Sequence, residues 1–312
     1  MPTPIYIKES DVAEFLDMPS AIQALRDVFA AEAKGQANTV PRTRWPFGGV
    51  RLNVMGGGER AAKHFAVKSY GGGAFHVMFY EEGKGLLAII EANTLGQIRT
   101  GAASAVATEK MARPDAGKVA LIGTGRQART QALALHAIGA LAELAVFSRN
   151  REKLVTFCYG LADELGGAPV VAAESGEEAV AGADIVVTAT NSTEPVLMNA
   201  WISPGTHVNA MGANAASRHE LDPEIVLRAS LIVTDHIAQA KTEAAEFIDL
   251  AKAGRFDWDK VKTLAEIVAG PRPARDAKAV TLFKSLGVGL EDVAVAAVIY
   301  ERAMASGRFK PV

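Results

Sequence analysis

Residues Gly123–Ala128, with the sequence GTGRQA, have the types and spacing needed to bind the pyrophosphate of a dinucleotide. They fit the pattern G-x-G-x-x-G/A, directly after the apolar run KVALI and before a stretch with small apolar residues at helical spacing. The first glycine permits a tight turn, the second lets the backbone approach the phosphates, and the last small residue lets helix and strand pack closely. The free N–H groups of the helix N-terminus would then bind the phosphates. We therefore expect a dinucleotide site that includes Gly123, Thr124, Gly125, Arg126, Gln127 and Ala128, the alternative being a glycine turn that only connects a strand to a helix.

The next apolar run ends in FSRN, and this segment bears on the choice of cofactor. NAD sites usually place Asp or Glu here to hold the ribose 2′-OH, whereas an arginine accommodates a 2′-phosphate. The chain offers Ser148, Arg149, Asn150 and Arg151 instead of an acid. We therefore expect NADP(H) as the preferred cofactor, with NAD(H) possible, unless Arg149 is only a solvated residue at a strand end.

The elements that would position this loop alternate along the chain from about residue 118. Strands are expected at KVALI, LAVF, DIVVTAT, THVNAM and LIVT, with helical stretches between them. Alternation of this kind builds a parallel sheet covered on both faces. The predicted fold class is therefore α/β, with a Rossmann-type doubly wound parallel sheet over residues 115–289 and an α+β domain for substrate binding and dimerisation over residues 1–114 and 290–312.

The first ninety residues predict two helices followed by an antiparallel sheet. Asp11 and Glu14 are expected to form a capping pair for the first helix, and Pro19 suits the first turn of the second. Further on the period changes to two: the apolar residues of VRLNV alternate with polar ones, which favours a half-buried sheet, and AFHVMFY and GLLAIIEA follow as strands. The last segment, GLEDVAVAAVIYERAMASG, is expected to be an amphipathic helix that returns to this first domain.

The composition excludes several classes of protein. Among 312 residues, 33 Lys+Arg against 35 Asp+Glu give a formal net charge of −2, and no basic stripe favours nucleic acid as a partner. A single cysteine excludes an internal disulfide and a cysteine-cluster zinc site, so we expect no metal and a cytoplasmic location. Proline, glycine and asparagine interrupt the uncharged stretch Pro195–Ser217, and the first residues lack the pattern of a signal peptide, so neither a membrane span nor export is expected.

Five segments resemble the ornithine cyclodeaminase/mu-crystallin family in their order and spacing. They are VPRT (40–43), AVKSY (66–70), LGQIRTGAASAVAT (95–108), the GTGRQA loop and NAMGANAASRHELD (209–222). The resemblance covers nearly the whole chain. It implies a homodimer whose first domain carries substrate and dimer contacts, beside a Rossmann domain for the cofactor. Family members act on a carbon that bears nitrogen next to a carboxylate, and they exchange a hydride with C4 of nicotinamide.

By this resemblance, Arg42, Lys68 and Arg99 hold the substrate carboxylate, Gly287 lies near the substrate, and Lys68 is a candidate proton donor. Fixed cations suit a small anion, and arginine can clamp a carboxylate with two parallel hydrogen bonds. The alternative is that the arginines are surface ion-pair partners and that Lys68 is a solvated strand residue. His64 shares the Lys68 face of its strand and is a further candidate for proton transfer, although a histidine there is more often structural.

The resemblance also implies cofactor contacts outside the glycine loop. Thr190 matches a contact at the end of the third strand, and Met211 and Gly212 match the segment that passes under the nicotinamide. Leu286 belongs to a stretch that approaches from the other side. The full set of expected contacts outside the loop is Thr100, Ser148, Arg149, Asn150, Thr190, Asn191, Met211, Gly212 and Leu286.

Asn214 departs from the cyclodeaminase pattern, in which an aspartate at this position moves protons during ammonia loss. An amide can hold a substrate nitrogen or a water molecule, but it has no proton to exchange near neutral pH. Reduction of an imine needs little more than carboxylate anchoring, orientation and a hydride donor, and mu-crystallin-like ketimine reductases also lack this aspartate and use NADPH. The leading hypothesis is therefore an NAD(P)H-dependent imine reductase or amino-acid dehydrogenase for a small α-imino or α-amino acid, with Lys68 and Asn214 as catalytic residues.

Two alternatives stay open at this point. The first is ornithine cyclodeaminase, which converts L-ornithine to L-proline and ammonia with NAD and needs proton transfers that Asn214 would serve poorly. The second is a catalytically silent protein that binds NADPH and a small anionic ligand, and the intact set of Arg42, Lys68 and Arg99 counts against it.

Overall fold

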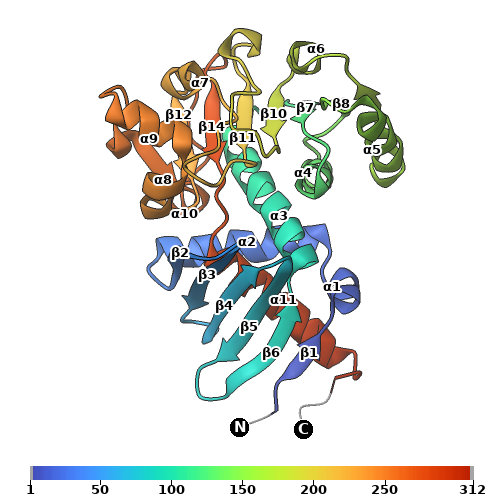
Figure 1. The fold of residues 1–312 in the computed structure, drawn as a ribbon, viewed down its shortest axis with the longest axis vertical. Helices are drawn as coiled ribbons and strands as arrows, with labels where there is room; N and C mark the ends of the chain where they lie inside the picture. Colours follow the sequence, from blue (N-terminus) through green and yellow to red (C-terminus); the bar gives the residue numbers. More distant parts are fainter. Residues whose placement is uncertain (1–2, 310–312) are drawn as a thin grey trace. The chain divides into compact units, whose positions relative to one another are not determined.

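The computed structural model describes residues 3–309 and divides into two compact units (Figure 1). Unit 1 comprises residues 1–103 and 287–312, and unit 2 comprises residues 104–286. One boundary falls inside helix α3, Asn93–Met111, and the other directly after Leu286. That these units are the substrate and cofactor domains of the protein stays a prediction.

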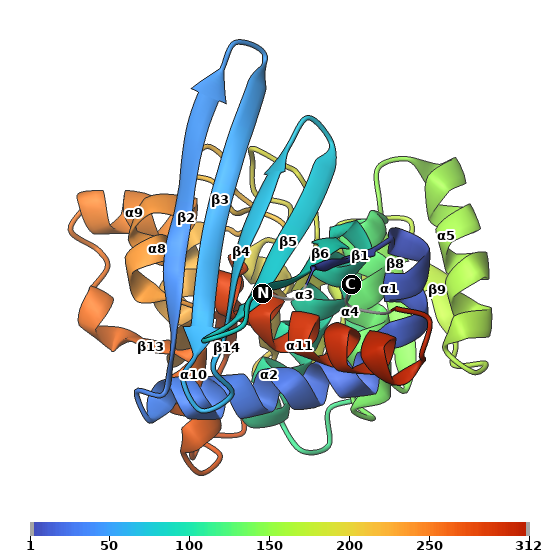
Figure 2. The ribbon, with the colours of Figure 1, turned by 90° about the horizontal axis from the view of Figure 1, so that it is seen from below.

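Unit 1 is built on a six-stranded sheet with the strand order β1-β6-β5-β4-β3-β2. Its elements are β1 (Ile5–Ile7), α1 (Glu9–Phe15), α2 (Met18–Ala33), β2 (Ala37–Phe47), β3 (Val50–Glu59), β4 (His64–Gly71), β5 (Ala74–Glu81), β6 (Gly85–Glu91), the start of α3 and α11 (Gly289–Ala305). The strands pair in antiparallel fashion except β1 and β6, which are parallel. Helix α11 packs on α2 and on β3, β4 and β5, so the last helix of the chain covers this sheet (Figure 2).

Helix α2 begins where Pro19 predicted its first turn. The carboxylate of Asp17 accepts the Ser20 N–H at 2.8 Å, and Pro19 lies in the first turn. Gly35 follows the end of the helix with a φ of +69°.

Helix α1 corrects the prediction of a capping pair at Asp11 and Glu14. Its N-cap residue is Lys8, and Asp11 is the third helical residue, whose carboxylate accepts the Lys8 N–H at 3.2 Å. The helix starts earlier because Glu9 has a tertiary role: its carboxylate accepts the first N–H groups of α3 at 2.6 and 2.9 Å. A contact across more than eighty residues cannot be read from a local cap signal.

The alternation predicted for VRLNV is confirmed in β3, and β4 alternates in the same way, but the side that faces the interior is not the more apolar one. Lys68 and Ala66 are buried on β4, and Asn53 is buried on β3, whereas Val50 is half-exposed. The buried side is the side that α11 covers. The other side carries exposed apolar residues, which we call the apolar sheet face: Val40, Trp45, Phe47, Val50 and Phe65.

Unit 2 is built on an eight-stranded parallel sheet with the order β13-β12-β14-β11-β10-β7-β8-β9. Its elements are β7 (Lys118–Ile122), α4 (Arg126–Ala137), β8 (Glu143–Phe147), α5 (Arg151–Glu164), β9 (Val170–Ala172), α6 (Gly176–Val180), β10 (Ile185–Thr188), η1 (Asn199–Trp201), β11 (His207–Ala210), α7 (Pro223–Arg228), β12 (Leu231–Thr234), α8 (Ile237–Glu243), α9 (Ala245–Lys252), η2 (Trp258–Lys260), β13 (Val261–Thr263), α10 (Leu264–Ala269) and β14 (Thr281–Lys284). The chain winds outward from β7 through β8 and β9, and then returns to β10 on the other side of β7. This reversal confirms the doubly wound sheet.

Strand β7 is buried on both sides, as a central parallel strand requires. Val119 and Leu121 belong to one apolar cluster together with Leu135 of α4. Ala120 and Ile122 belong to a second cluster. The five predicted strands are all present, while β9, β13 and β14 were not predicted.

Residues 3–309 contain neither a candidate membrane span nor a candidate metal-binding cluster. No helix there is both long enough and apolar enough to cross a membrane. No group of three or more His, Cys, Asp or Glu residues in the same range is placed to hold a metal ion. The one cysteine, Cys158, is buried and forms no disulfide.

Candidate active site

The glycine loop joins β7 to α4 and leaves the N-terminus of α4 without a side-chain cap. Gly125 is the N-cap residue, and the space where its side chain would lie is open. Gly123 adopts a φ of +119°, and its N–H donates to the Phe147 carbonyl at 2.9 Å. The side-chain oxygen of Gln127 is buried and accepts no hydrogen bond. Uncapped N–H groups beside an open glycine are the donors that a pyrophosphate needs, so the loop fits a dinucleotide.

The segment after β8 leaves two of its polar residues available to a ligand. Thr124 of the glycine loop donates its hydroxyl to Ser148 at 3.3 Å, and Arg149 is exposed. Asn150 caps α5 by accepting a backbone N–H at 2.9 Å. Arg151 donates to two carbonyls at the end of β9, each at 3.2 Å. Ser148 and Arg149 are therefore the residues here that can contact a ribose or a phosphate.

Glu220 ties together the loops that follow β10 and β11. Its Oε1 accepts the N–H of Thr190 at 2.7 Å and the hydroxyl of Thr190 at 2.8 Å. Its Oε2 accepts the N–H of Gly212 at 2.7 Å and that of Ala213 at 2.9 Å. Glu220 is fully buried. The structure thereby brings Thr190 and Gly212 together at the carboxyl ends of neighbouring strands.

The remaining predicted cofactor residues have different surroundings. Asn191 and Met211 are neighbours of Thr190 and Gly212 in the same two loops of unit 2. Leu286 follows β14, and its N–H donates to the carboxylate of Asp235 at 2.5 Å. Thr100 lies in unit 1, where its hydroxyl donates to the Gly96 carbonyl at 2.7 Å inside α3.

Lys68 and Arg99 meet two buried carboxylates at the start of α11. The Lys68 Nζ lies 2.7 Å from Asp292 Oδ1, and the Arg99 Nε lies 3.3 Å from the same oxygen. Arg99 Nη1 lies 2.5 Å from Glu291 Oε2. All four side chains are nearly inaccessible to solvent. We call these residues, together with Arg42, the cation cluster.

Arg42 joins the cluster through the backbone at Gly287. Its Nη2 donates to the Gly287 carbonyl at 2.8 Å. Gly287 has a φ of +73°, and a side chain at this position would collide with the Arg99 guanidinium, so only glycine fits. The four predicted substrate-binding residues, Arg42, Lys68, Arg99 and Gly287, therefore lie together in unit 1.

Three cations and two carboxylates meet in the cation cluster. Lys68 and Arg99 pair with Glu291 and Asp292, and Arg42 donates to the Gly287 carbonyl. Fixed cations suit a small anion, and arginine can clamp a carboxylate with two parallel hydrogen bonds. A single carboxylate group on a small molecule fits such a site.

The surroundings of Lys68 change its acidity. Burial lowers the pKa of the Lys68 ammonium below its usual 10.5, and the neighbouring Arg99 and Arg42 lower that pKa further. The Asp292 carboxylate acts in the opposite direction. A lysine of this kind exchanges its proton closer to neutral pH than an exposed one does.

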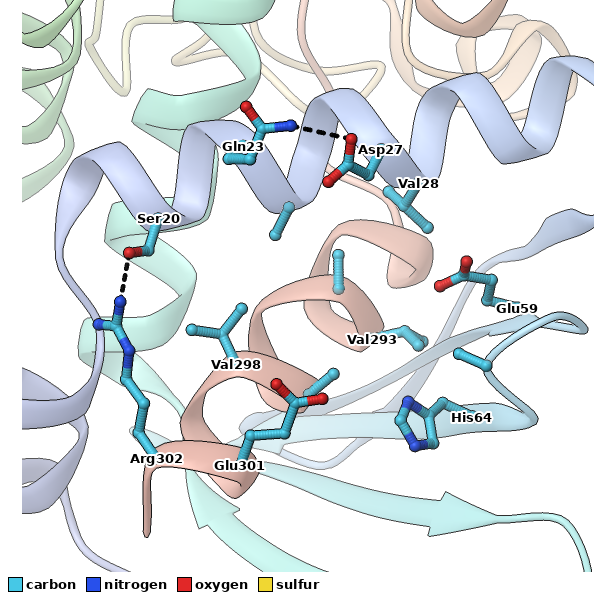
Figure 3. A pocket seen from close by; sticks show the side chains of 14 residues that line it. Ser20, Gln23, Asp27, Val28, Glu59, His64, Val293, Val298, Glu301 and Arg302 are labelled. Atoms are coloured by element: carbon cyan, nitrogen blue, oxygen red, sulfur yellow. Dashed lines mark hydrogen bonds between the residues drawn. The ribbon is translucent and has the colours of Figure 1, made fainter. Parts of the chain in front are cut away.

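Two other candidates for proton transfer lie elsewhere. Asn214 is half-buried in the loop after β11 of unit 2. His64 lines a separate cavity of about 440 Å³ between α2 and α11 (Figure 3), and its ring packs against Phe79 at 4.9 Å. Because His64 and Lys68 are four residues apart on an extended strand, roughly 13 Å separates their backbones. His64 is therefore not part of the cation cluster.

Three acidic residues of the site were missed in the sequence: Glu220, Glu291 and Asp292. The last two are consecutive in GLEDV and are followed in the same helix by the apolar run VAVAAVI. Acids are rarely buried without partners, so their position in this helix was a signal for buried cations. Glu220 gives no comparable signal, because its partners are mainly backbone N–H groups.

Several known proteins are similar to this chain in sequence or in structure. Delta(1)-pyrroline-2-carboxylate reductase of Bacillus cereus is 34% identical over 223 residues, which cover 71% of this chain and 68% of that protein. The structure of the Thermococcus litoralis enzyme of the same name, in complex with NADH and L-proline, matches with a TM-score of 0.93 and 29% identity, covering 99% of this chain and 100% of that one. An archaeal alanine dehydrogenase dimer with bound NAD matches with a TM-score of 0.92 and 28% identity, covering 100% of this chain and 99% of that one.

A family model matches almost the whole sequence. The model described as "Ornithine cyclodeaminase/mu-crystallin family" matches residues 4–307. The resemblance seen in five short segments thus extends from the first strand to the end of the last helix. The chain belongs to the ornithine cyclodeaminase/mu-crystallin family of NAD(P)-dependent enzymes.

Proposed function

We propose that this protein is a cytosolic NAD(P)H-dependent reductase of small α-imino acids, which in reverse acts as an amino-acid dehydrogenase. One observation carries the proposal: the cations Arg42, Lys68 and Arg99 lie together in unit 1, and Lys68 and Arg99 are buried there. The relatives named above act on, or hold, amino and imino acids that bear a carboxylate. We assign substrate anchoring to unit 1 and cofactor binding to unit 2.

The substrate carboxylate is held by Arg42, Lys68 and Arg99. Two arginines supply forked donors, and the carbonyl contact of Arg42 to Gly287 fixes the direction of one of them. Bound NAD(P)H supplies the hydride that ends on the imine carbon. Lys68 supplies the proton that ends on the nitrogen, and its lowered pKa suits that role. Asn214 orients the substrate nitrogen through its amide.

NADPH is the proposed preferred form of the cofactor. Two features of the segment after β8 support this proposal: no acid is present there to hold a ribose 2′-OH, and the exposed Arg149 offers a cation for a 2′-phosphate. Ser148, which accepts the Thr124 hydroxyl, supplies a second polar group at the same end of the site.

A homodimer is the proposed assembly, formed through the apolar sheet face of unit 1. Exposed apolar groups gather there on β2, β3 and β4, with Phe47 65% exposed and Val40 57% exposed. The archaeal alanine dehydrogenase relative is a dimer. Replacing Trp45 by Asp should yield a monomer in light scattering, whereas a wild-type monomer would contradict the proposal.

The reaction is tested by following NADPH at 340 nm with cyclic imines that carry a 2-carboxylate. Consumption of NADPH with formation of the amino acid supports the reductase. Conversion of ornithine to proline without net change in the cofactor would support a cyclodeaminase and contradict the role given to Asn214. If the protein binds NADPH but oxidises it with none of the imines tested, the result would support a catalytically silent binding protein and contradict the reductase.

A further inference from the structure

We infer that Glu220 is a positioning residue, which fixes the backbone loops that receive the nicotinamide half of the dinucleotide. The inference rests on the proposed cofactor binding and deepens it. It assigns a role to a buried carboxylate whose four hydrogen bonds all go to two loops at one edge of the sheet.

The topology of unit 2 separates the two halves of the nucleotide site. The winding of the sheet reverses between β7 and β10, and dinucleotides bind across the carboxyl ends of the strands at such a reversal. The loop after β7 takes the pyrophosphate. Strand β8, with Ser148 and Arg149 at its end, lies on the side that takes the adenosine half. Strands β10 and β11 lie on the opposite side, so their loops take the nicotinamide half.

The three loops touch one another, so their positions are coupled. A side chain at Gly123 would collide with the Ala189 carbonyl, at the start of the loop after β10. A side chain at Gly212 would collide with the backbone of Thr190. The loop after β10 is thus packed between the glycine loop and the loop after β11. A shift of this middle loop would therefore move the backbone surface that is proposed to contact the nicotinamide.

Glu220 is the group that fixes this middle loop. Each carboxylate oxygen accepts two hydrogen bonds, one pair from Thr190 and the other from Gly212 and Ala213. Because both oxygens are occupied by the protein and the side chain is fully buried, Glu220 acts on the cofactor through the loops and not by contact. An amide in its place would point its N–H groups at one of the two pairs of donors, so at least one backbone N–H of that pair would lose its acceptor.

The backbone of Glu220 is fixed by a second buried carboxylate, that of Glu246. Its backbone N–H donates to Glu246 Oε1 at 2.9 Å. Glu246 forms a fully buried ion pair with Lys284 at 3.2 Å, and this lysine lies at the end of β14. The carboxylate therefore cannot follow the loops if they move, and it sets their position relative to the sheet.

The experiment compares the affinity of the whole cofactor with that of its adenosine half. The proteins are the wild type, Glu220→Gln and a matched control, Asp184→Asn. Asp184 also accepts two backbone N–H groups, those of Gly117 and Lys118 at 3.0 Å, but at the amino ends of β7 and β10. The probes are NADPH, followed by its fluorescence, and adenosine 2′,5′-bisphosphate, followed by calorimetry; NADH and AMP replace them if the wild type prefers NADH.

The expected result is selective. Glu220→Gln should raise the Kd of the dinucleotide about tenfold or more, because at least one buried backbone N–H that fixes the loops loses its acceptor, while the Kd of the adenosine fragment changes less than about twofold. Asp184→Asn should leave the ratio of the two Kd values as in the wild type. Equal changes for both probes, or no change for either, would overturn the role of Glu220.

A second variant covers the case in which Glu220→Gln does not fold. Glu220→Asp keeps both oxygens but withdraws them by one methylene, and it should show the same selectivity with a smaller rise. A non-selective Glu220→Asp would overturn the inference in the same way. If the wild type binds neither probe, the proposed cofactor binding fails, and that outcome is distinct from failure of the Glu220 inference.

Discussion

The two candidate sites of this protein use different chemical groups: charged side chains in unit 1 and mainly backbone N–H groups in unit 2. The cation cluster of unit 1 consists of charged side chains, and three of its contacts are ion pairs buried from water. The proposed nucleotide site of unit 2 consists mainly of backbone: an uncapped helix N-terminus at Gly125, and two loops whose N–H groups donate to Glu220. The first site depends on which side chains are present, and the second on where the main chain runs.

Because of this difference, we expect the two sites to respond differently to amino-acid substitutions. A buried ion cluster fails when one charge is removed, because its partner is left without compensation. A backbone site fails when a loop moves, and single surface charges near it only adjust the preference between ligands. The predictions below test this contrast in descending order of expected effect.

Asp292→Asn should produce the largest effect, because Lys68 and Arg99 both lose a buried carboxylate partner. We expect the free energy of unfolding in urea at pH 7 to fall by about 3–5 kcal/mol. Asp249→Asn is the control, since Asp249 pairs with His219 at an exposed position of unit 2 and should cost about 1 kcal/mol or less. Equal losses of unfolding free energy in the two variants would show that the buried ion pairs of the cation cluster contribute no more stability than an exposed pair does.

Arg42→Met should mainly affect the substrate. Loss of charge-assisted hydrogen bonds to the carboxylate should lower kcat/KM for the imino acid roughly 10–150-fold, while the Kd for NADPH stays as in the wild type. Arg51→Met, on the neighbouring strand and exposed, is the control and should leave kcat/KM unchanged. A loss of NADPH binding in Arg42→Met would break the assignment of substrate and cofactor to different units.

The alkaline side of the pH profile should report Lys68. Burial holds the pKa of Lys68 below 10.5, with Asp292 opposing and Arg99 and Arg42 adding to that shift, so the active ammonium is lost as pH rises through the lowered pKa. Activity should therefore decline at a pH below 10.5. In Lys68→Arg the charge does not titrate in this range, so that decline should disappear, although the rate at neutral pH is lower. An unchanged alkaline decline in Lys68→Arg would exclude Lys68 as its source.

Arg149→Asp should have the smallest effect, because this side chain is exposed. The ratio of kcat/KM for NADPH to that for NADH should fall roughly tenfold, with little change in the rate with NADH. Arg151→Asp is the control, because Arg151 is already held by carbonyls at the end of β9. If both variants shift the ratio equally, general surface charge determines the preference and not a contact to the 2′-phosphate.

The backbone site was the easier one to predict. Gly123, Gly125 and Ala128 are required by main-chain geometry, so they form a local pattern that can be read without knowing any partner. The strand before them, Lys118–Ile122, is a continuous apolar run and was predicted without error. The short strands Val170–Ala172 and Val261–Thr263 have only three residues each, too few for a pattern to stand out.

The side-chain site was only half predicted. Its cations lie in recognisable motifs, but Asp292 is 224 residues from Lys68 in the chain, and no local pattern links them. The buried side of β4 carries Lys68 while Phe65 faces outward, the reverse of the usual polarity of a strand. Only the partners on α11 make such an arrangement stable, and those partners are a property of the tertiary fold.

The proposed function requires that Arg42, Lys68 and Arg99 select a substrate that carries a carboxylate. Its most direct test is the rate of NADPH oxidation with two cyclic imines that differ only in that group, Δ1-pyrroline-2-carboxylate and Δ1-pyrroline. The account predicts a kcat/KM at least about tenfold higher for the carboxylate, with most of the difference lost in Arg42→Met. Equal rates with both imines in the wild type would contradict it.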